Sequence, residues 1–416
     1  MPVARVGRSI FYGWAVVAAA FVSHLLSYGV LTVAFGVLFP FMADALGLGR
    51  GLLASAGVVT RLTSAAIAPA LGPLVDRYGP RRFMLLGILS LAAGSITLAL
   101  AHATWQVFLG YGVVMAIASV TLGELTGDAT VARWFVRRRG RALAFATMGL
   151  STAGIVVPLP LAWIITRHGW RQAWMALGVT SLVLGLAAAA AMRARPEDHG
   201  LAPDGDPPPR APRAGAPITV VAERSLSARQ AARTPAFWLL VLSTNLAGLA
   251  LFGINLHLFS YVTDKGLGVG MAAGLVTYLY VLHTAAKPLW GMIAERIHVR
   301  YCIAACYAGG ALGVAVLVVS ASATALLTFA TIYGLTRGAQ SFVTSLAWAN
   351  YFGREAQGAI RGLASPFRFL AAAAGPVVGG LLYDATGSYT IAFVVFAATF
   401  ALGAATALAA RPPRPE

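Results

Sequence analysis

The sequence is poor in charged residues. Only 11% of its 416 residues are Asp, Glu, Lys or Arg, whereas 58% are hydrophobic and the mean hydropathy is +0.76. A typical soluble domain carries about 25% charged residues, so this composition excludes an ordinary water-exposed surface. Most of the surface must face lipid, and we predict an integral membrane protein whose partner is the lipid bilayer.

Acidic residues and cysteines are the scarcest. The chain has 14 Asp and Glu residues and two cysteines, Cys302 and Cys306, which lie four positions apart in one apolar run. Two cysteines cannot form a disulfide framework, and a zinc site needs more ligands. The sequence also lacks a phosphate-binding glycine loop, a nucleophile elbow and a metal-ligand cluster. We therefore expect no enzyme activity, no cofactor and no metal site.

Basic residues outnumber acidic ones, for a formal net charge of +17. Such an excess also occurs in nucleic-acid-binding proteins, but here the arginines gather in alternate turns between apolar runs, as the positive-inside rule describes. We therefore predict no nucleic-acid partner. The same pattern predicts a multi-pass protein of the cell membrane (inner or plasma membrane) with both termini in the cytoplasm.

Long apolar runs recur along the whole chain, and a bilayer-spanning helix needs about 20 such residues. The first run, from Tyr12 to Met42, is longer than the roughly 7–15 apolar residues of a signal peptide, so we expect it to remain as a span. The fold class that follows is an all-α membrane protein with twelve transmembrane helices in two pseudo-symmetric six-helix bundles. The predicted spans are 12–39, 52–75, 83–103, 105–131, 141–166, 172–192, 236–262, 271–294, 301–321, 324–349, 363–383 and 387–410.

Residues 193–235 differ in kind, because they are rich in proline, glycine and charge. Such a segment cannot bury a core and is typical of a flexible linker. We therefore divide the chain into an N-terminal bundle (1–192), a cytoplasmic linker (193–235) and a C-terminal bundle (236–416). Ser227 is placed to cap a short surface helix before the seventh span.

One signature, Pro-x-x-Gly-x-x-x-(Asp/Glu)-Arg-x-x-x-Arg, occurs twice, and its two glycines lie 219 positions apart. A second echo, 132–135 against 349–352, has an offset of 217 positions. Duplicated halves with a site between them are a recurrent transporter design. The two copies comprise Pro69, Gly72, Asp76, Arg77 and Arg81, and Pro288, Gly291, Glu295, Arg296 and Arg300.

The stretch from Gly72 to Arg82 resembles the cytoplasmic loop motif between spans two and three of the major facilitator superfamily, and the resemblance covers essentially the whole chain. It implies transport by alternating access. It also implies that the acidic residue and arginines of each copy form a gating latch, made and broken as the halves rock.

Within that superfamily the chain is most similar to the monocarboxylate transporter and oxalate/formate antiporter branch. That branch has Asp or Asn in span eight, followed four residues later by Arg-Pro, where this chain has His283 and Lys287-Pro288. The resemblance implies that Lys287 is the partner of the substrate anion and that His283 takes the place of the proton-linked group. The supporting residues are 11–14, 134–135, 137–139, 169–171, 195–201 and 387–389.

Ionisable residues inside the spans point to an anionic substrate without the resemblance. Each costs roughly 2.5–3.5 kcal/mol at the bilayer centre, so such groups face a cavity or a partner. Tyr280, His283 and Lys287 share one helix face, which suits carboxylate binding. The candidate substrate-binding residues are Tyr280, His283, Lys287, Arg61 and Arg368; the alternative for Lys287 and Arg368 is that they extend to the membrane surface.

Two acidic residues, Glu124 and Asp128, lie four positions apart in span four, and Arg337 lies near the middle of span ten. One interpretation is that Arg337 pairs with one of these carboxylates. The other is that Glu124 or Asp128, like His283, carries a proton. Buried pairs and proton relays look alike in a sequence.

The predicted function is secondary active transport of small organic anions, most directly monocarboxylates, coupled to protons, with the single chain as the functional unit. Efflux of drugs or metabolites by the same fold is the first alternative, and a membrane sensor that kept the fold is the second. The identity of the substrate, the direction and the mode of coupling stay open.

Overall fold

The structure, a computed structural model, describes residues 11–48, 50–206, 225–266, 268–319 and 322–413, and their regular structure is helical. The first half contains α1 (Gly13–Tyr28), η1 (Gly29–Ala34), α2 (Phe35–Leu46), α3 (Arg50–Tyr78), α4 (Pro80–Ala99), α5 (Thr104–Val107), η2 (Phe108–Val114), α6 (Met115–Thr121), η3 (Glu124–Asp128), α7 (Ala129–Trp134), α8 (Arg139–Val156), α9 (Pro158–His168) and α10 (Trp170–Ala191). The second half contains α12 (Pro235–Asp264), α13 (Gly268–Ala294), α14 (Val299–Val319), α15 (Ala323–Phe352), α16 (Gln357–Thr386) and α17 (Thr390–Ala409).

Ten helical segments within the described ranges are long and apolar enough to cross a membrane. The 27-residue α13 and the 30-residue α15 have the length to do so as well, since a helix rises about 1.5 Å per residue. The prediction of twelve spanning helices is therefore confirmed. Three of these spans are built from several segments: α1–η1–α2, α5 to α7, and α8–α9.

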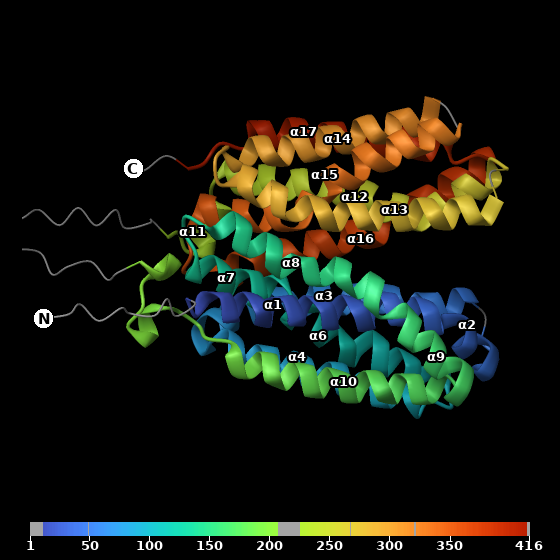
Figure 1. The fold of residues 1–416 in the computed structure, drawn as a ribbon, viewed down its shortest axis with the longest axis horizontal. Coiled ribbons are helices and arrows are strands. Elements are labelled where there is room, and N and C mark those ends of the chain that lie inside the picture. The colour runs from blue at the N-terminus through green and yellow to red at the C-terminus, as the bar shows by residue number, and fades with distance from the viewer. Residues whose placement is uncertain (1–10, 49, 207–224, 267, 320–321, 414–416) are drawn as a thin grey trace, which may run out of the picture.

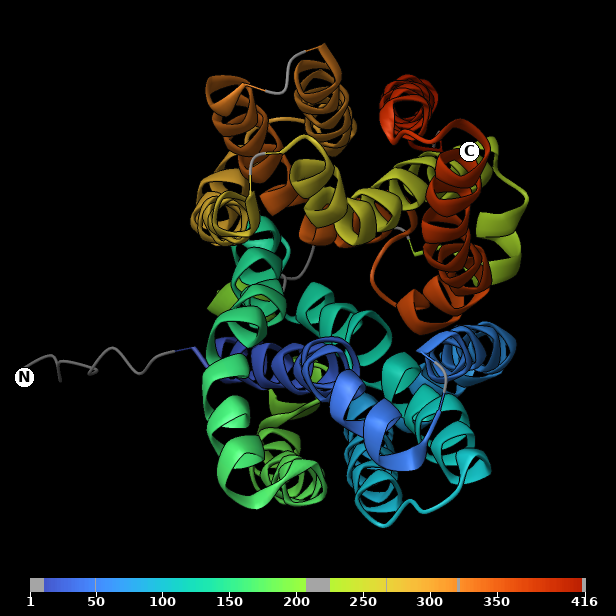
Figure 2. The same cartoon turned by 90° about the vertical axis from the view of Figure 1, so that its right-hand side faces the viewer.

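The helices form two bundles that lie side by side (Figures 1 and 2), with α1 to α10 in one and α12 to α17 in the other. The bundles meet mainly where α3 packs on α16 and where α8 packs on α13. These contacts are reciprocal, because the second span of each half touches the fifth span of the other. Glycines allow the close approach: a Cβ on Gly72 would collide with the backbone of Gly358, and one on Gly291 would lie 3.2 Å from the Cα of Arg141.

The arginine-rich turns lie together at one end of the molecule, on the left in Figure 1. We call this the basic end and define it by the turns at residues 77–82, 133–141, 296–300 and 353–361. Both described chain ends are also there. Phe11 packs against Trp134 and Phe135 with ring centroids 5.8 and 5.6 Å apart, and the Tyr351 hydroxyl donates to the Ala410 carbonyl over 2.6 Å.

The start of the predicted linker folds onto the first half. Asp204, at φ 62° and buried, accepts hydrogen bonds from the N–H groups of Val136, Arg137 and Arg138 at 3.1, 2.8 and 3.1 Å. Asp204 therefore anchors the start of the predicted linker to the turn before α8.

Further along, Ser227 caps the short helix α11 (Ala228–Ala232) by accepting from the Gln230 N–H, so that prediction is confirmed. Residues 207–224 lie outside the described part. The division at 1–192, 193–235 and 236–416 stays a prediction.

Spans one and four are irregular. They contain three π-helical turns, η1, η2 and η3, a form that is frequent at functional sites. Between α6 and η3 the helix is broken, because Gly123 adopts φ 138° and ψ −129°, a conformation that essentially only glycine tolerates. This break sits directly before Glu124 and Asp128, so the two predicted intramembrane carboxylates start a new helical segment inside the membrane.

The contact between α1 and α8 provides a test of this packing. A Cβ on Gly149 would overlap the carbonyl oxygen of Phe21, whereas one on Gly36 would meet no atom within 4 Å. We expect Gly149→Ala to destabilise the protein by about 1–3 kcal/mol through overpacking, visible as a lower midpoint in detergent thermal unfolding. Gly36→Ala is the matched control and should be neutral or slightly stabilising, because alanine is the better helix former. Equal midpoints for the two variants would contradict the packing described here.

Candidate substrate-binding and gating site

The basic end is held closed by Asp76, the acidic residue of the first signature. Its carboxylate accepts hydrogen bonds from the N–H groups of Gly358 and Ala359, at 3.0 and 2.7 Å, and forms an ion pair with Arg133. Gly358 and Ala359 start α16 in the other half, and a helix N-terminus favours a negative charge. Asp76 therefore joins the two halves through a helix end.

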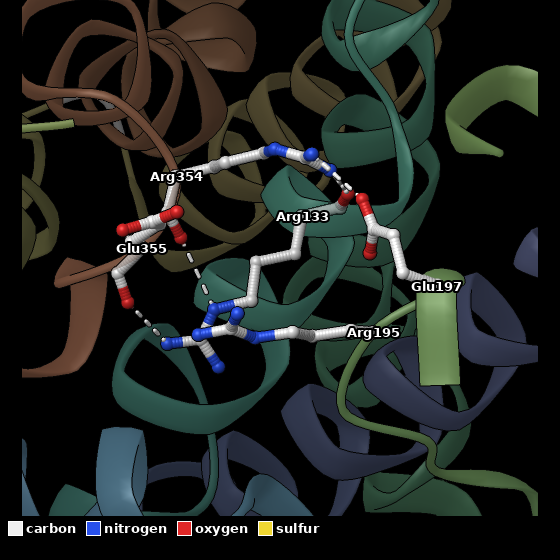
Figure 3. Close-up of a pocket in the computed structure, with 5 residues that line it drawn as sticks. All are labelled: Arg133, Arg195, Glu197, Arg354 and Glu355. Carbon is white, nitrogen blue, oxygen red and sulfur yellow. Dashed lines mark hydrogen bonds and ion pairs between the residues drawn. The ribbon is translucent and has the colours of Figure 1, made fainter. Parts of the chain in front are cut away.

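Arg133 extends this connection to the turn between α15 and α16 (Figure 3). Its guanidinium donates to the carbonyls of Arg354 and Glu355 at 3.1 and 2.9 Å, and Arg354 pairs with Glu197 at 2.6 Å. These side chains, together with Arg195, line a small pocket at the basic end. The lining side chains bind one another across the turn, so this pocket is part of the closed basic end.

The second signature repeats the arrangement on the opposite side of the interface. Glu295 accepts from the N–H of Arg141 at 3.2 Å and pairs with the Arg141 side chain at 2.9 Å, at the start of α8. We call Asp76, Arg133, Glu295 and Arg141 the gate.

The arginines of the two signatures are not part of these contacts, and their role in the latch stays a prediction. Arg77 lies over the ring of Tyr78 and Arg300 over that of Tyr301, at 5.3 and 4.6 Å. Among the described residues, no carboxylate forms an ion pair with Arg77, Arg81, Arg296 or Arg300. The cations across the gate are instead Arg133 and Arg141, which the sequence placed in a basic turn without a specific partner.

The predicted face of α13 points at the first half. The Lys287 ammonium is fully buried and donates to the Thr147 carbonyl over 2.6 Å. The His283 imidazole lies 3.4 Å from the Ser151 hydroxyl, and the Tyr280 hydroxyl lies 3.4 Å from that of Tyr28. Lys287 therefore does not extend to the membrane surface, and all three side chains line the interface between the halves.

Two arginines flank this face. The Arg337 guanidinium carbon lies 5.5 Å from the centroid of the Tyr280 ring, and that of Arg61 lies 5.4 Å from the Phe252 ring. Both arginines interact electrostatically with Tyr28, which places them around one central region. Arg61, Lys287 and Arg337 have no carboxylate within ion-pair distance in the part of the chain that the structure describes.

The predicted pairing of Arg337 with Glu124 or Asp128 is wrong for this structure. The fully buried Asp128 carboxylate lies 2.7 Å from His24 Nε2, accepts from the Ser345 hydroxyl at 2.5 Å and lies 3.8 Å from Arg361. The aromatic rings beside Arg337 provide cation–π contacts in place of a carboxylate.

The sequence did not identify Arg361 as an intramembrane charge, because span eleven was predicted at 363–383, whereas α16 begins at Gln357. The signal was present: Arg361 and Arg368 lie seven positions apart, which is two helical turns on one face. Glu124 pairs with Arg368 at 3.4 Å, and the two side chains keep 31% and 41% of their surface exposed. Thus α16 presents two arginines to the two carboxylates of η3.

The comparisons with known proteins agree with this architecture. The family model of the Major Facilitator Superfamily matches residues 17–282 and 270–416. Human Monocarboxylate transporter 11 is 27% identical over 397 residues, which cover 92% of this chain and 80% of the relative. The Fujikurins efflux protein of Gibberella fujikuroi is 26% identical over 283 residues, covering 66% of this chain and 55% of the relative.

Among solved structures, the transporter FucP in the outward conformation superimposes with a TM-score of 0.69 at 16% identity. The match covers 94% of this chain and 98% of FucP. The proton:xylose symporter XylE gives a TM-score of 0.72 at 14% identity over 95% of this chain and 94% of its own. With twelve spanning helices in two bundles and a family match along nearly its whole length, the chain belongs to the major facilitator superfamily and is a transporter, not an enzyme.

Proposed function

We propose that this transporter moves small organic anions, monocarboxylates most directly, by alternating access and together with protons. The observation that carries the proposal is the surplus of positive charge between the halves. Among the described residues, the region between the halves holds five cations (Arg61, Lys287, Arg337, Arg361 and Arg368), of which only Arg361 and Arg368 lie beside the carboxylates Asp128 and Glu124. Burying unpaired cations is costly, and an anionic substrate would offset that cost.

The relatives support the same substrate class. Human Monocarboxylate transporter 11 aligns along nearly the whole chain, and so does bovine Monocarboxylate transporter 13, at 25% identity over 94% of it. The fungal efflux protein favours the alternative, in which the same fold exports a metabolite. Export is compatible with an anionic substrate, because the charge of the central region determines which substrate is bound and not the direction of transport.

The gate supports alternating access. Asp76, Arg133, Glu295 and Arg141 tie the halves together at the basic end. With that end in the cytoplasm, as the positive-inside rule favours, the described conformation is closed to the cytoplasm. Lys287 bonds across to α8, so the motion that separates α8 from α13 would uncover its ammonium for substrate.

The two lysines allow a sharp test of the anion site. Radiolabelled pyruvate uptake into proteoliposomes, driven by an inward proton gradient, should fall at least about tenfold in Lys287→Gln, since a hydrogen bond to a charged group contributes roughly 1.5–3 kcal/mol. Lys265→Gln is the matched control, because Lys265 is exposed in the turn after α12, and it should transport like the wild type. Wild-type uptake by Lys287→Gln would remove the central residue of this proposal.

The gate predicts a separate change in conformation. Asp76→Asn loses the charge that binds the start of α16, so the basic end should open more often. A reporter Ala68→Cys, at a fully buried position on α3, in a Cys302→Ser/Cys306→Ser background, should then react several times faster with a hydrophilic maleimide in detergent. Asp44→Asn, on the exposed surface of α2, should leave that rate unchanged. An unaltered rate in Asp76→Asn would show that the carboxylate does not hold the gate.

A further inference from the structure

The two carboxylates of η3 have opposite environments. Asp128 is completely buried and has partners from three helices, namely His24, Ser345 and Arg361. The Glu124 carboxylate has one ion-pair partner among the described residues, Arg368 at 3.4 Å, which is longer than the roughly 2.7–2.9 Å of a strong charge-assisted hydrogen bond, and the Glu124 carbonyl accepts from Arg361 at 3.4 Å. Asp128 is therefore fixed in place, whereas Glu124 is held loosely and remains accessible.

Arg368 has hydrogen-bonding capacity to spare. Its Nε is buried and has no hydrogen-bond partner among the described residues, and its guanidinium carbon lies 4.8 Å from the Phe369 ring centroid. With 41% of the side chain exposed, the guanidinium can receive a second anion. A guanidinium binds carboxylates with two parallel hydrogen bonds, and Glu124 does not use that geometry here.

From this contrast we infer that Glu124 is an exchangeable internal ligand of Arg368, which the carboxylate of the substrate displaces. The inference rests on the proposed function and adds an order of events to it. The substrate anion takes the guanidinium, and the freed Glu124 carboxylate takes a proton from water on the open side. On release the anion leaves, Glu124 gives up its proton and rebinds Arg368.

The charges balance in this exchange. One anion and one proton enter together, so the central region carries the same net charge before and after loading. The proton comes from a hydronium ion in the water on the open side, so one O–H bond of hydronium breaks as the O–H bond of Glu124 forms. The break in the helix at Gly123 suits the exchange. Glu124 is the first residue after the break, so α6 does not continue into the segment that carries this carboxylate.

The ionisable groups around η3 leave Glu124 as the accessible acid. Arg361 and Arg368 come from α16, His24 from α1 and Arg61 from α3, and Tyr307 of α14 interacts electrostatically with Glu124. Among the neighbours α4, α6, α7 and α8, α6 has no ionisable residue. The ionisable residues of α4, α7 and α8 all lie at the basic end; they are Arg81, Arg82, Arg133, Arg139 and Arg141.

The test is Glu124→Gln in proteoliposomes with radiolabelled pyruvate. This variant keeps the shape of the side chain but cannot take the proton. We expect pyruvate exchange without a gradient to persist, with a KM lowered about tenfold because nothing competes for Arg368. Uptake should lose its response to a proton gradient and become sensitive to membrane potential, since the anion then moves alone. Retained exchange also shows that the variant is folded.

Two further variants sharpen the outcome. Arg368→Gln should raise the KM about tenfold or more, and Asp44→Asn, an acid-to-amide control on exposed α2, should behave like the wild type. Proton-driven uptake with an unchanged KM in Glu124→Gln would overturn the inference. If proton-driven uptake were lost in Asp128→Asn but kept in Glu124→Gln, the proton site would be Asp128 instead. A failure of the proposed function gives a different result. The wild-type protein then takes up no pyruvate, and no small carboxylate raises the thermal stability of the wild type or of Glu124→Gln. The inference about Glu124 fails together with the proposed function in that case.

Discussion

The bond between the Asp76 carboxylate and the first N–H groups of α16 is the constraint on which the rest of the arrangement depends. Its two sides belong to different halves, so it sets which end of the molecule is closed. The pseudo-symmetric contact at Glu295 is weaker than the one at Asp76, because Glu295 binds one N–H group and one partly exposed arginine, Arg141. More hydrogen bonds must therefore break on the α3–α16 side of the gate than on the α8–α13 side when the halves move apart.

Beyond the gate, two acid–arginine pairs join η3 of the first half to α16. Asp76 binds the helix start, Asp128 lies 3.8 Å from Arg361, and Glu124 lies 3.4 Å from Arg368. Buried ion pairs add little net stability, because desolvation offsets their attraction. Both pairs cross the interface between the halves: Asp128–Arg361 is buried, whereas Glu124–Arg368 is partly exposed and therefore more accessible to solutes.

Much of the fold could be predicted from the sequence, whereas the pairing of the intramembrane charges could not, for identifiable physical reasons. Long apolar runs and a repeated signature define twelve helices and two halves, and the spacing of Tyr280, His283 and Lys287 places them on one face. The pairing of charges depends on distances between helices, which no local pattern contains. Arg361 lies just before the predicted span 363–383, whereas α16 already begins at Gln357, because its first turns contain polar and charged residues that do not extend an apolar run. The break at Gly123 also has no local signature, since a single glycine in an apolar run is common.

The Asp204 clamp has a consequence for how the chain is made. Its carboxylate accepts hydrogen bonds from three backbone N–H groups in the turn before α8, and Trp134 donates to the carbonyl of Arg193 over 3.0 Å. These groups lie after the last helix of the first half, so that half is finished only when residues up to about 206 have left the ribosome. Asp204 precedes α12, the first spanning helix of the second half, in the sequence. The first half therefore contains every residue needed to close its own basic turn, and this turn does not depend on the second half for its shape.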